Sequence, residues 1–160
     1  MFFFETLVVL IKYNQQSITL LMFEIYQKTL SKKTTFKGIG LHSGKRSKIN
    51  LLPAEANTGI IFKRIDLEKN NLIQANFKNV TSARLCTTLE NKFGVKVSTV
   101  EHLLAALYIV GIDNALIEID NEEVPIMDGS AKNFLQSIKP EDLIVQSEKR
   151  KYHRTNSLHC

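Results

Sequence analysis

The spacing of apolar residues divides the chain into a strand-rich first part and a later part in which helices and strands alternate. Between Thr29 and Leu89, short runs of β-branched and aromatic residues are separated by Gly, Asn and charged turns, which is typical of antiparallel strands. We expect strands over residues 34–41, 47–52, 59–65, 73–80, 84–89 and 95–97.

The apolar period then changes to that of a helix over residues 98–111. Ser98 and Glu101 have the spacing of a capping box, and Gly111 is suited to the helix C-terminus. Helices on one face of a mostly antiparallel sheet make a two-layer α+β domain, which is the fold class that this pattern predicts. The elements expected to follow are a strand over 115–120, an amphipathic helix over 130–138 and a further element beginning within 140–146.

The two ends of the chain do not share this periodicity. Residues 1–21 have no positive charge before their apolar run and no small-residue cleavage site, so they do not match a secretory signal. We predict that they are a non-native or disordered extension and that translation starts at Met22. Residues 147–160 are polar and basic, and we predict a disordered tail there. The globular domain is therefore expected to span residues 22–146.

Composition indicates an ordinary globular protein. The chain has 160 residues, of which 44% are apolar and 23% charged. No stretch is apolar enough to cross a bilayer, and Cys86 and Cys160 form neither a disulfide framework nor a CxxC pair. We therefore expect a cytoplasmic protein without a transmembrane segment. The net charge of +5 is spread along the chain and does not by itself select a partner. Without an RNA-binding aromatic signature, a nucleic-acid partner is not expected.

The most informative polar pair is Glu101-His102, at the start of the predicted helix. The positive end of the helix dipole disfavours a protonated imidazole, so His102 could offer a nitrogen to a metal. Glu101 could accept a proton from water. The dipeptide alone favours a purely structural interpretation, because Glu101 also fits a capping box and His102 could be an ordinary histidine at a helix end. The pair is not an HExxH motif, since position 106 is Ala.

The remaining candidates are individually weak. His42 lies in a predicted turn, where a solvated side chain is common. Cys86 resembles a small buried apolar residue, since no Lys or His beside it in the sequence would activate its thiol. Acidic residues in the loop after the predicted strand 115–120 are expected to be solvated; these are Asp120, Glu122 and Glu123.

Six segments taken together resemble one enzyme family. Their order and spacing are similar to those of UDP-3-O-acyl-N-acetylglucosamine deacetylases, the zinc enzymes of lipid A synthesis, from about Met22 to Ile138. The segments are Gly38-Ile39-Gly40-Leu41-His42-Ser43-Gly44, Pro53-Ala54-Glu55-Ala56-Asn57-Thr58-Gly59-Ile60, Arg84-Leu85-Cys86-Thr87-Thr88-Leu89, Ser98-Thr99-Val100-Glu101-His102-Leu103-Leu104-Ala105-Ala106-Leu107, Gly111-Ile112-Asp113-Asn114 and Val124-Pro125-Ile126-Met127-Asp128-Gly129-Ser130-Ala131.

The resemblance implies a role for each candidate. His102 matches a ligand of Zn²⁺, and Glu101 matches the general base that activates water for attack on the acetamide carbonyl. Leu85, Cys86 and His42 match residues near the substrate, UDP-3-O-acyl-N-acetylglucosamine. The family fold has two similar domains with helices packed between outer sheets, and this chain matches the first.

The resemblance also implies that the site is incomplete. Family members take further zinc ligands from a second domain, whereas His153 and His159 here do not fit the ligand pattern of that domain. We expect a truncated chain that is inactive unless the second domain is supplied, in cis or as a separate chain. We further expect Leu103, Leu107 and Phe134 to be exposed where that domain would pack. The alternative is a non-catalytic domain that binds a nucleotide-sugar or a protein; a basic nucleic-acid-binding module has less support.

Overall fold

The structure is a computed structural model, and it describes residues 25–151. The predicted start at Met22, the extension 1–21 and the tail beyond residue 151 lie outside the described residues. The largest element is a five-stranded sheet in the order β2-β3-β9-β4-β5, in which only β4 and β9 pair in parallel. Its strands are β2 (Thr34–Ile39), β3 (Arg46–Pro53), β4 (Ile60–Arg64), β5 (Leu72–Gln74) and β9 (Ala115–Ile119).

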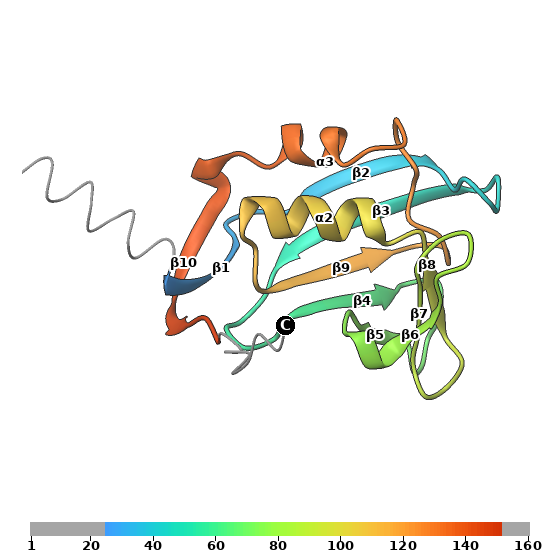
Figure 1. The fold of residues 1–160 in the computed structure, drawn as a ribbon, viewed down its shortest axis with the longest axis horizontal. Helices are drawn as coiled ribbons and strands as arrows, with labels where there is room; N and C mark the ends of the chain where they lie inside the picture. The colour runs from blue at the N-terminus through green and yellow to red at the C-terminus, as the bar shows by residue number, and fades with distance from the viewer. Residues whose placement is uncertain (1–24, 152–160) are drawn as a thin grey trace, which may run out of the picture.

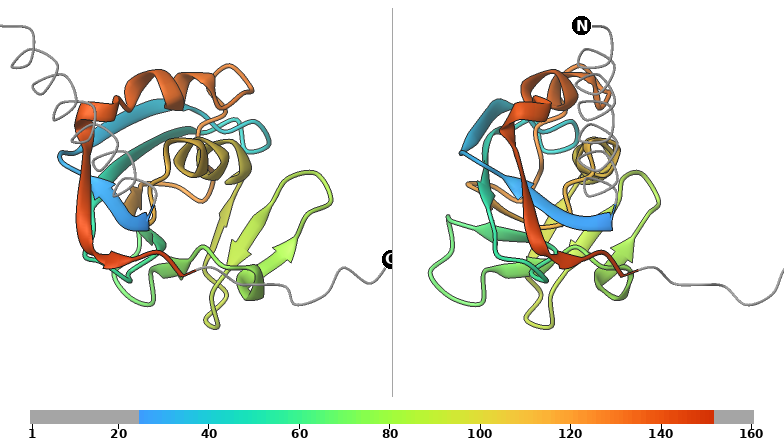
Figure 2. Two further views of the ribbon diagram at one scale, coloured as in Figure 1. Left: turned by 60° about the vertical axis from the view of Figure 1, so that its left-hand side comes forward. Right: turned by 90° about the vertical axis from the view of Figure 1, so that its left-hand side faces the viewer.

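Two helices, α2 (Glu101–Val110) and α3 (Lys132–Ser137), cover one face of this sheet (Figures 1 and 2). Alternate strand residues point to that face, so Ile117 and Ile119 are fully buried while Glu118 between them is not. The rings of Phe36 and Phe134 meet edge to face, with centroids 4.9 Å apart, and join β2 to α3. The predicted two-layer α+β fold is confirmed.

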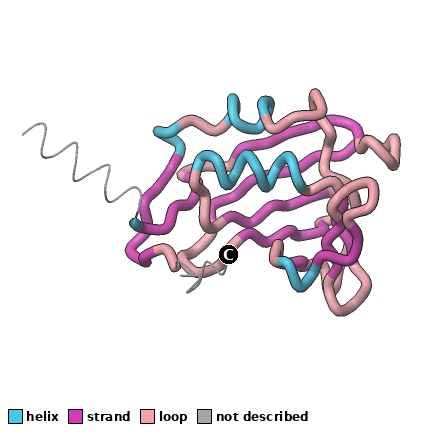
Figure 3. Tube along the Cα trace, viewed as in Figure 1, coloured by secondary structure: helices cyan, strands magenta, loops and turns pink. Residues whose placement is uncertain are grey.

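Two smaller sheets lie at opposite ends of α2 (Figures 1 and 3). At the C-terminal end, β1 (Tyr26–Leu30) pairs with β10 (Leu143–Lys149). At the N-terminal end, β6 (Val80–Ser82), β7 (Thr88–Glu90) and β8 (Lys96–Ser98) form a three-stranded sheet. Two short 3₁₀ turns, η1 (Phe77–Asn79) and η2 (Pro140–Asp142), complete the described elements. No helix among residues 25–151 is long and apolar enough to cross a membrane.

The β1–β10 pair corrects the predicted domain boundary. Residues 147–149 belong to β10, and the Arg150 amide donates to the Ile25 carbonyl. The prediction that a disordered tail begins at residue 147 is therefore wrong for the residues up to 150. Strand β1 was not predicted either. Its partner lies more than a hundred residues away along the chain, so the local pattern of Tyr26–Leu30 carries no sign of the pairing.

The start of α2 also differs from the prediction. The helix begins at Glu101, and Ser98 is the last residue of β8, where its amide donates to the Glu122 carbonyl. The predicted capping box is therefore absent. The predicted end is confirmed, because Gly111 closes the helix in the left-handed conformation with φ 76°.

The residues expected to be exposed on the helices are buried. Leu103 and Phe134 are 0% exposed and Leu107 is 1% exposed, because α2 and α3 turn these side chains onto the chain's own sheet. That prediction is wrong. The exposed face of α2 instead carries Tyr108 and Ile109.

Candidate active site

The chain enters α2 through a strained residue. Thr99, directly after β8, has a φ of 57°, which is uncommon for a β-branched side chain. It is also 2% exposed, and its hydroxyl donates to Oε1 of Glu123. Such a conformation persists only where the surroundings over-determine it. The turn at Thr99 sets where Glu101 and His102 stand, on the first turn of the helix.

The side chain of Glu101 binds a neighbouring segment instead of capping its own helix. Its Oε2 accepts a hydrogen bond from the Thr87 amide at 3.1 Å, so the segment before β7 lies against the start of α2. The other oxygen, Oε1, accepts no hydrogen bond from a described residue. The carboxylate is thus oriented through one oxygen and leaves the second available to a bound molecule.

The substrate-region candidates Leu85 and Cys86 belong to that same segment. Leu85 is 84% exposed, an unusual state for so large an apolar side chain. Cys86 is half-buried, and its Sγ lies 3.8 Å from Oγ1 of Thr88. The bond between Glu101 and Thr87 therefore brings both residues to the N-terminal end of α2.

Glu123 lies at the same end of α2, although it was not among the predicted site residues. It was expected to be solvated but is 2% exposed, and its carboxylate accepts the amides of His42 and Ser43 at 2.9 and 2.7 Å and the Thr99 hydroxyl at 3.0 Å. Burial raises the pKa of Glu123, but these donors, His42 first, outweigh it and lower the pKa to about 2. No local signal distinguished Glu123 from its exposed neighbour Glu122; only the tertiary contacts do.

Glu123 also explains a glycine in the first matching segment. A Cβ added at Gly40 would lie 2.3 Å from Oε2 of Glu123 and 2.3 Å from Oγ of Ser43. Only a residue without a side chain fits there. The turn after β2 is therefore shaped around the carboxylate.

His42 is placed by its backbone. Its amide is bound by Glu123, while the residue as a whole is exposed. Three predicted segments thus meet at one end of α2: the His42 turn through Glu123, the Leu85–Cys86 segment through Glu101, and the helix start itself. Among the described residues, no hydrogen bond joins the His102 imidazole to the other candidates.

The described residues do not fit a complete zinc site. Catalytic zinc usually has three protein ligands, and no three His, Cys, Asp or Glu side chains of residues 25–151 are grouped as a metal would need. His102 could supply one ligand. His153 and His159 lie outside the described residues.

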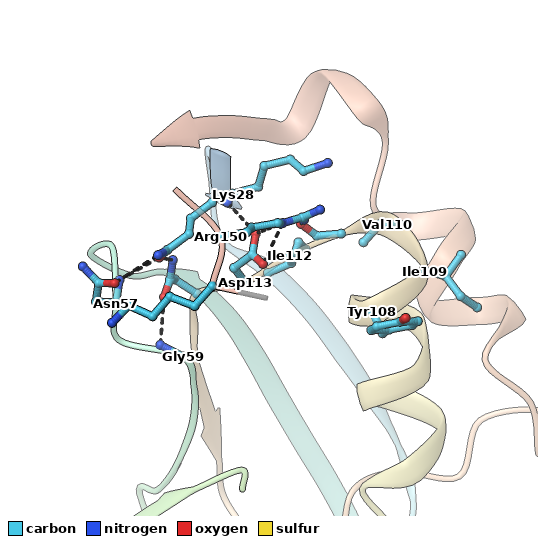
Figure 4. Close-up of a pocket in the computed structure, with 13 residues that line it drawn as sticks. Lys28, Asn57, Gly59, Tyr108, Ile109, Val110, Ile112, Asp113 and Arg150 are labelled. Carbon is cyan, nitrogen blue, oxygen red and sulfur yellow. Dashed lines mark hydrogen bonds and ion pairs between the residues drawn. The ribbon is translucent and has the colours of Figure 1, made fainter. Parts of the chain in front are cut away.

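A cavity of about 750 Å³ lies at the opposite end of α2. Its lining includes Tyr108, Asp113 and Arg150, and Figure 4 shows the last two facing each other. Arg150 Nε lies 2.9 Å from Asp113 Oδ1, and its Nη2 donates to the Gly111 carbonyl. These charged groups hold β10 to the helix end. The cavity is therefore built from contacts that maintain the fold, and it contains none of the predicted site residues.

Most of the chain is similar in sequence to known proteins. Residues 27–159 match the family model for LpxC, UDP-3-O-acyl N-acetylglycosamine deacetylase. The chain is 52% identical over 128 residues to the UDP-3-O-acyl-N-acetylglucosamine deacetylase of Citrifermentans bemidjiense, covering 80% of this chain and 42% of the relative. It is 48% identical over 130 residues to the same enzyme of Idiomarina loihiensis, with 81% and 42% covered.

The extent of the match defines the class of the protein. Because the family model matches residues 27–159, this chain belongs to the UDP-3-O-acyl-N-acetylglucosamine deacetylase family. The chain spans 42% of the length of the curated relatives it matches.

Proposed function

We propose that this chain supplies the first half of a deacetylase that removes the N-acetyl group of UDP-3-O-acyl-N-acetylglucosamine in lipid A synthesis. The observation that carries the proposal is the placement of Glu101. Its carboxylate stands beside His102 at the helix start and is oriented by the Thr87 amide, with one oxygen unbound by described residues. This arrangement suits a general base, which must reach a water molecule while being held in place.

The roles of the other residues follow from their positions. His102 would be one ligand of Zn²⁺, and the further protein ligands have to come from outside the described residues. Leu85, Cys86 and His42 would line the substrate region at the same helix end. A cytoplasmic location fits a nucleotide-sugar substrate.

The missing ligands imply a partner. We expect it to be the second domain of the family, in cis or as a separate chain, packed on the outer face of α2. Ala105 lies three residues after His102, and Ile109 lies four residues after Ala105, so all three share one side of the helix. Ala105 and Ile109 are both exposed. Tyr108, 86% exposed, extends this apolar face. Without that partner the chain is expected to be inactive.

A specific observation favours a second candidate function. Because residues 25–151 contain no three-ligand metal group, the chain could instead be a domain that binds a nucleotide-sugar or a protein without catalysis. The deacetylase proposal predicts hydrolysis once a second domain is present, whereas the binding proposal predicts affinity without hydrolysis.

The test is Glu101→Gln, made in the enzyme assembled from this chain and the second half of a relative. Acetate release from UDP-3-O-acyl-N-acetylglucosamine should fall by about 10²–10⁴-fold, the usual contribution of a general base, while substrate binding measured by calorimetry stays. Glu122→Gln, the same change at an exposed glutamate, is the control. If the assembled wild-type protein binds substrate but releases no acetate, the non-catalytic alternative holds.

A further inference from the structure

We propose that Glu123 is a positioning residue of the candidate active site, which fixes the turn carrying His42 against the start of α2. The inference rests on the proposed function, because it takes the N-terminal end of α2 to be the site. Glu123 itself does not touch the reacting groups. It acts through the backbone of His42 and the side chain of Thr99.

The geometry joins two segments that are far apart in the chain. Oε1 of Glu123 accepts both the His42 amide, at 2.9 Å, and the Thr99 hydroxyl, at 3.0 Å. The donors on these two segments therefore converge on one oxygen atom. Oε2 accepts the Ser43 amide at 2.7 Å, which holds the turn at a second point. Hydrogen bonds to an ionised acceptor are roughly twice as strong as neutral ones, so this junction is stiff.

The residues around Glu123 leave space for its carboxylate. Gly40 leaves room that a Cβ would fill, at 2.3 Å from Oε2. Gly38 similarly leaves room for Pro125, whose Cβ would lie 2.9 Å from an added Cβ. The loop after β9 thus packs tightly beneath β2 and presents Glu123 to both segments. The strained φ of Thr99 is held by the same bond.

Position at this junction matters because Glu101 and His102 follow Thr99 by two and three residues. A shift of the helix start moves both, and a misplacement of about 1 Å can cost about 10²-fold in rate. A residue that only stabilised the fold would lower the amount of folded protein and leave the site unchanged in the molecules that remain folded. A positioning residue changes the site itself.

The experiment is Glu123→Gln in the full chain, followed by NMR at a temperature where the variant is folded. A glutamine amide has one acceptor oxygen, so its NH₂ group faces the amide of either Ser43 or His42 whichever way it turns. We expect changed resonances at His42, Ser43 and Thr99 that extend to Glu101 and the His102 ring, with Asp113 and Arg150 at the other helix end unchanged. Glu122→Gln should change none of these.

A second experiment measures the kinetics of the enzyme assembled from this chain and the second half of a relative. There, Glu123→Gln should lower kcat by on the order of tenfold to a hundredfold, with a smaller rise in KM because the His42 turn also shifts. If wild-type assembly shows no hydrolysis, the proposed function fails, and the NMR pattern alone decides the inference.

A milder pair of variants covers the case in which Glu123→Gln does not fold. Thr99→Val removes only the hydroxyl that bonds Oε1, and Thr99→Ser retains it. The positioning role predicts displaced Glu101 and His102 resonances in Thr99→Val and their recovery in Thr99→Ser. Changes confined to the donors, with Glu101, His102 and kcat unaffected, would overturn it.

Discussion

The two ends of α2 are bound by side chains of opposite charge, and the two ends have different roles. At the C-terminal end, the cation of Arg150 donates to the Gly111 carbonyl and pairs with Asp113. At the N-terminal end, the anions of Glu101 and Glu123 accept backbone amides from neighbouring segments. Both arrangements match the helix dipole, which favours cations at its C-terminus and anions at its N-terminus.

The difference lies in what remains available for chemistry. The cavity at the C-terminal end is lined by polar groups that bind one another, among them Arg150 and Asp113. The N-terminal end instead gathers Glu101, His102 and the His42 turn, and none of these residues lines that cavity. In this domain, cavity size does not locate the candidate site; the convergence of loops on two carboxylates does.

The largest effect that would test this comparison is the pH dependence of stability. Glu123 has an ordinary pKa of 4.5 and a folded-state pKa of about 2. Because the folded state keeps the carboxylate ionised, its stabilisation is present above pH 4.5 and is lost as the pH falls toward 2. The shift corresponds to on the order of 3 kcal/mol. Urea unfolding at stepped pH should show this loss in the wild type, and a similar loss in Glu123→Gln would contradict it.

Next in size is Gly40→Ala at the N-terminal end. Its Cβ would meet Glu123 and Ser43 at 2.3 Å, so the free energy of unfolding should fall by about 2–3 kcal/mol. Gly44→Ala is the matched control in the same turn: its φ is 64°, but a Cβ would meet nothing within 4 Å. We expect about 1 kcal/mol there, from backbone strain alone. Equal losses in thermal unfolding would argue against close packing around Glu123.

A smaller effect is expected from Arg150→Ala at the C-terminal end. The change removes the ion pair with Asp113 and the bond to Gly111, which should cost about 1–2 kcal/mol. Urea unfolding measures the loss, and Lys149→Ala, at the exposed last residue of β10 directly before Arg150, serves as control. The His42 and His102 resonances should not move. If they do, the two helix ends are coupled and the comparison breaks down.

The smallest effect on stability concerns the outer face of α2. Ile109→Lys replaces a side chain that is 64% exposed, so the free energy of unfolding should change by less than about 0.5 kcal/mol. Association should change more, because exposed apolar surface promotes it. Light scattering of the chain alone should show less self-association than in the wild type. Unchanged association would show that Ile109 does not contribute to association through the outer face of α2.

The helix and strand pattern was predictable because it depends on local spacing. Strand β9, the Gly111 helix end and the α+β class follow from apolar periodicity and from a residue that tolerates φ 76°. The burial of α2 was predicted less well. The apolar face of this helix was predicted to be exposed until a second domain packs on it, but Leu103 and Leu107 pack on the chain's own sheet. Periodicity shows that a face is apolar, and it does not show which surface covers it.

The sequence by itself determined the order of a strand-rich part followed by a helix, a strand and a helix. It also determined the Glu101-His102 pair and the family to which the chain belongs. Only the tertiary structure decided that Glu123 is buried while Glu122 is exposed, that Glu101 binds Thr87 instead of capping its helix, and that Arg150 closes α2. Each of these contacts joins residues from different elements. The energies of these contacts depend on distances and burial that arise only when the chain folds, so they could not be predicted from local sequence patterns.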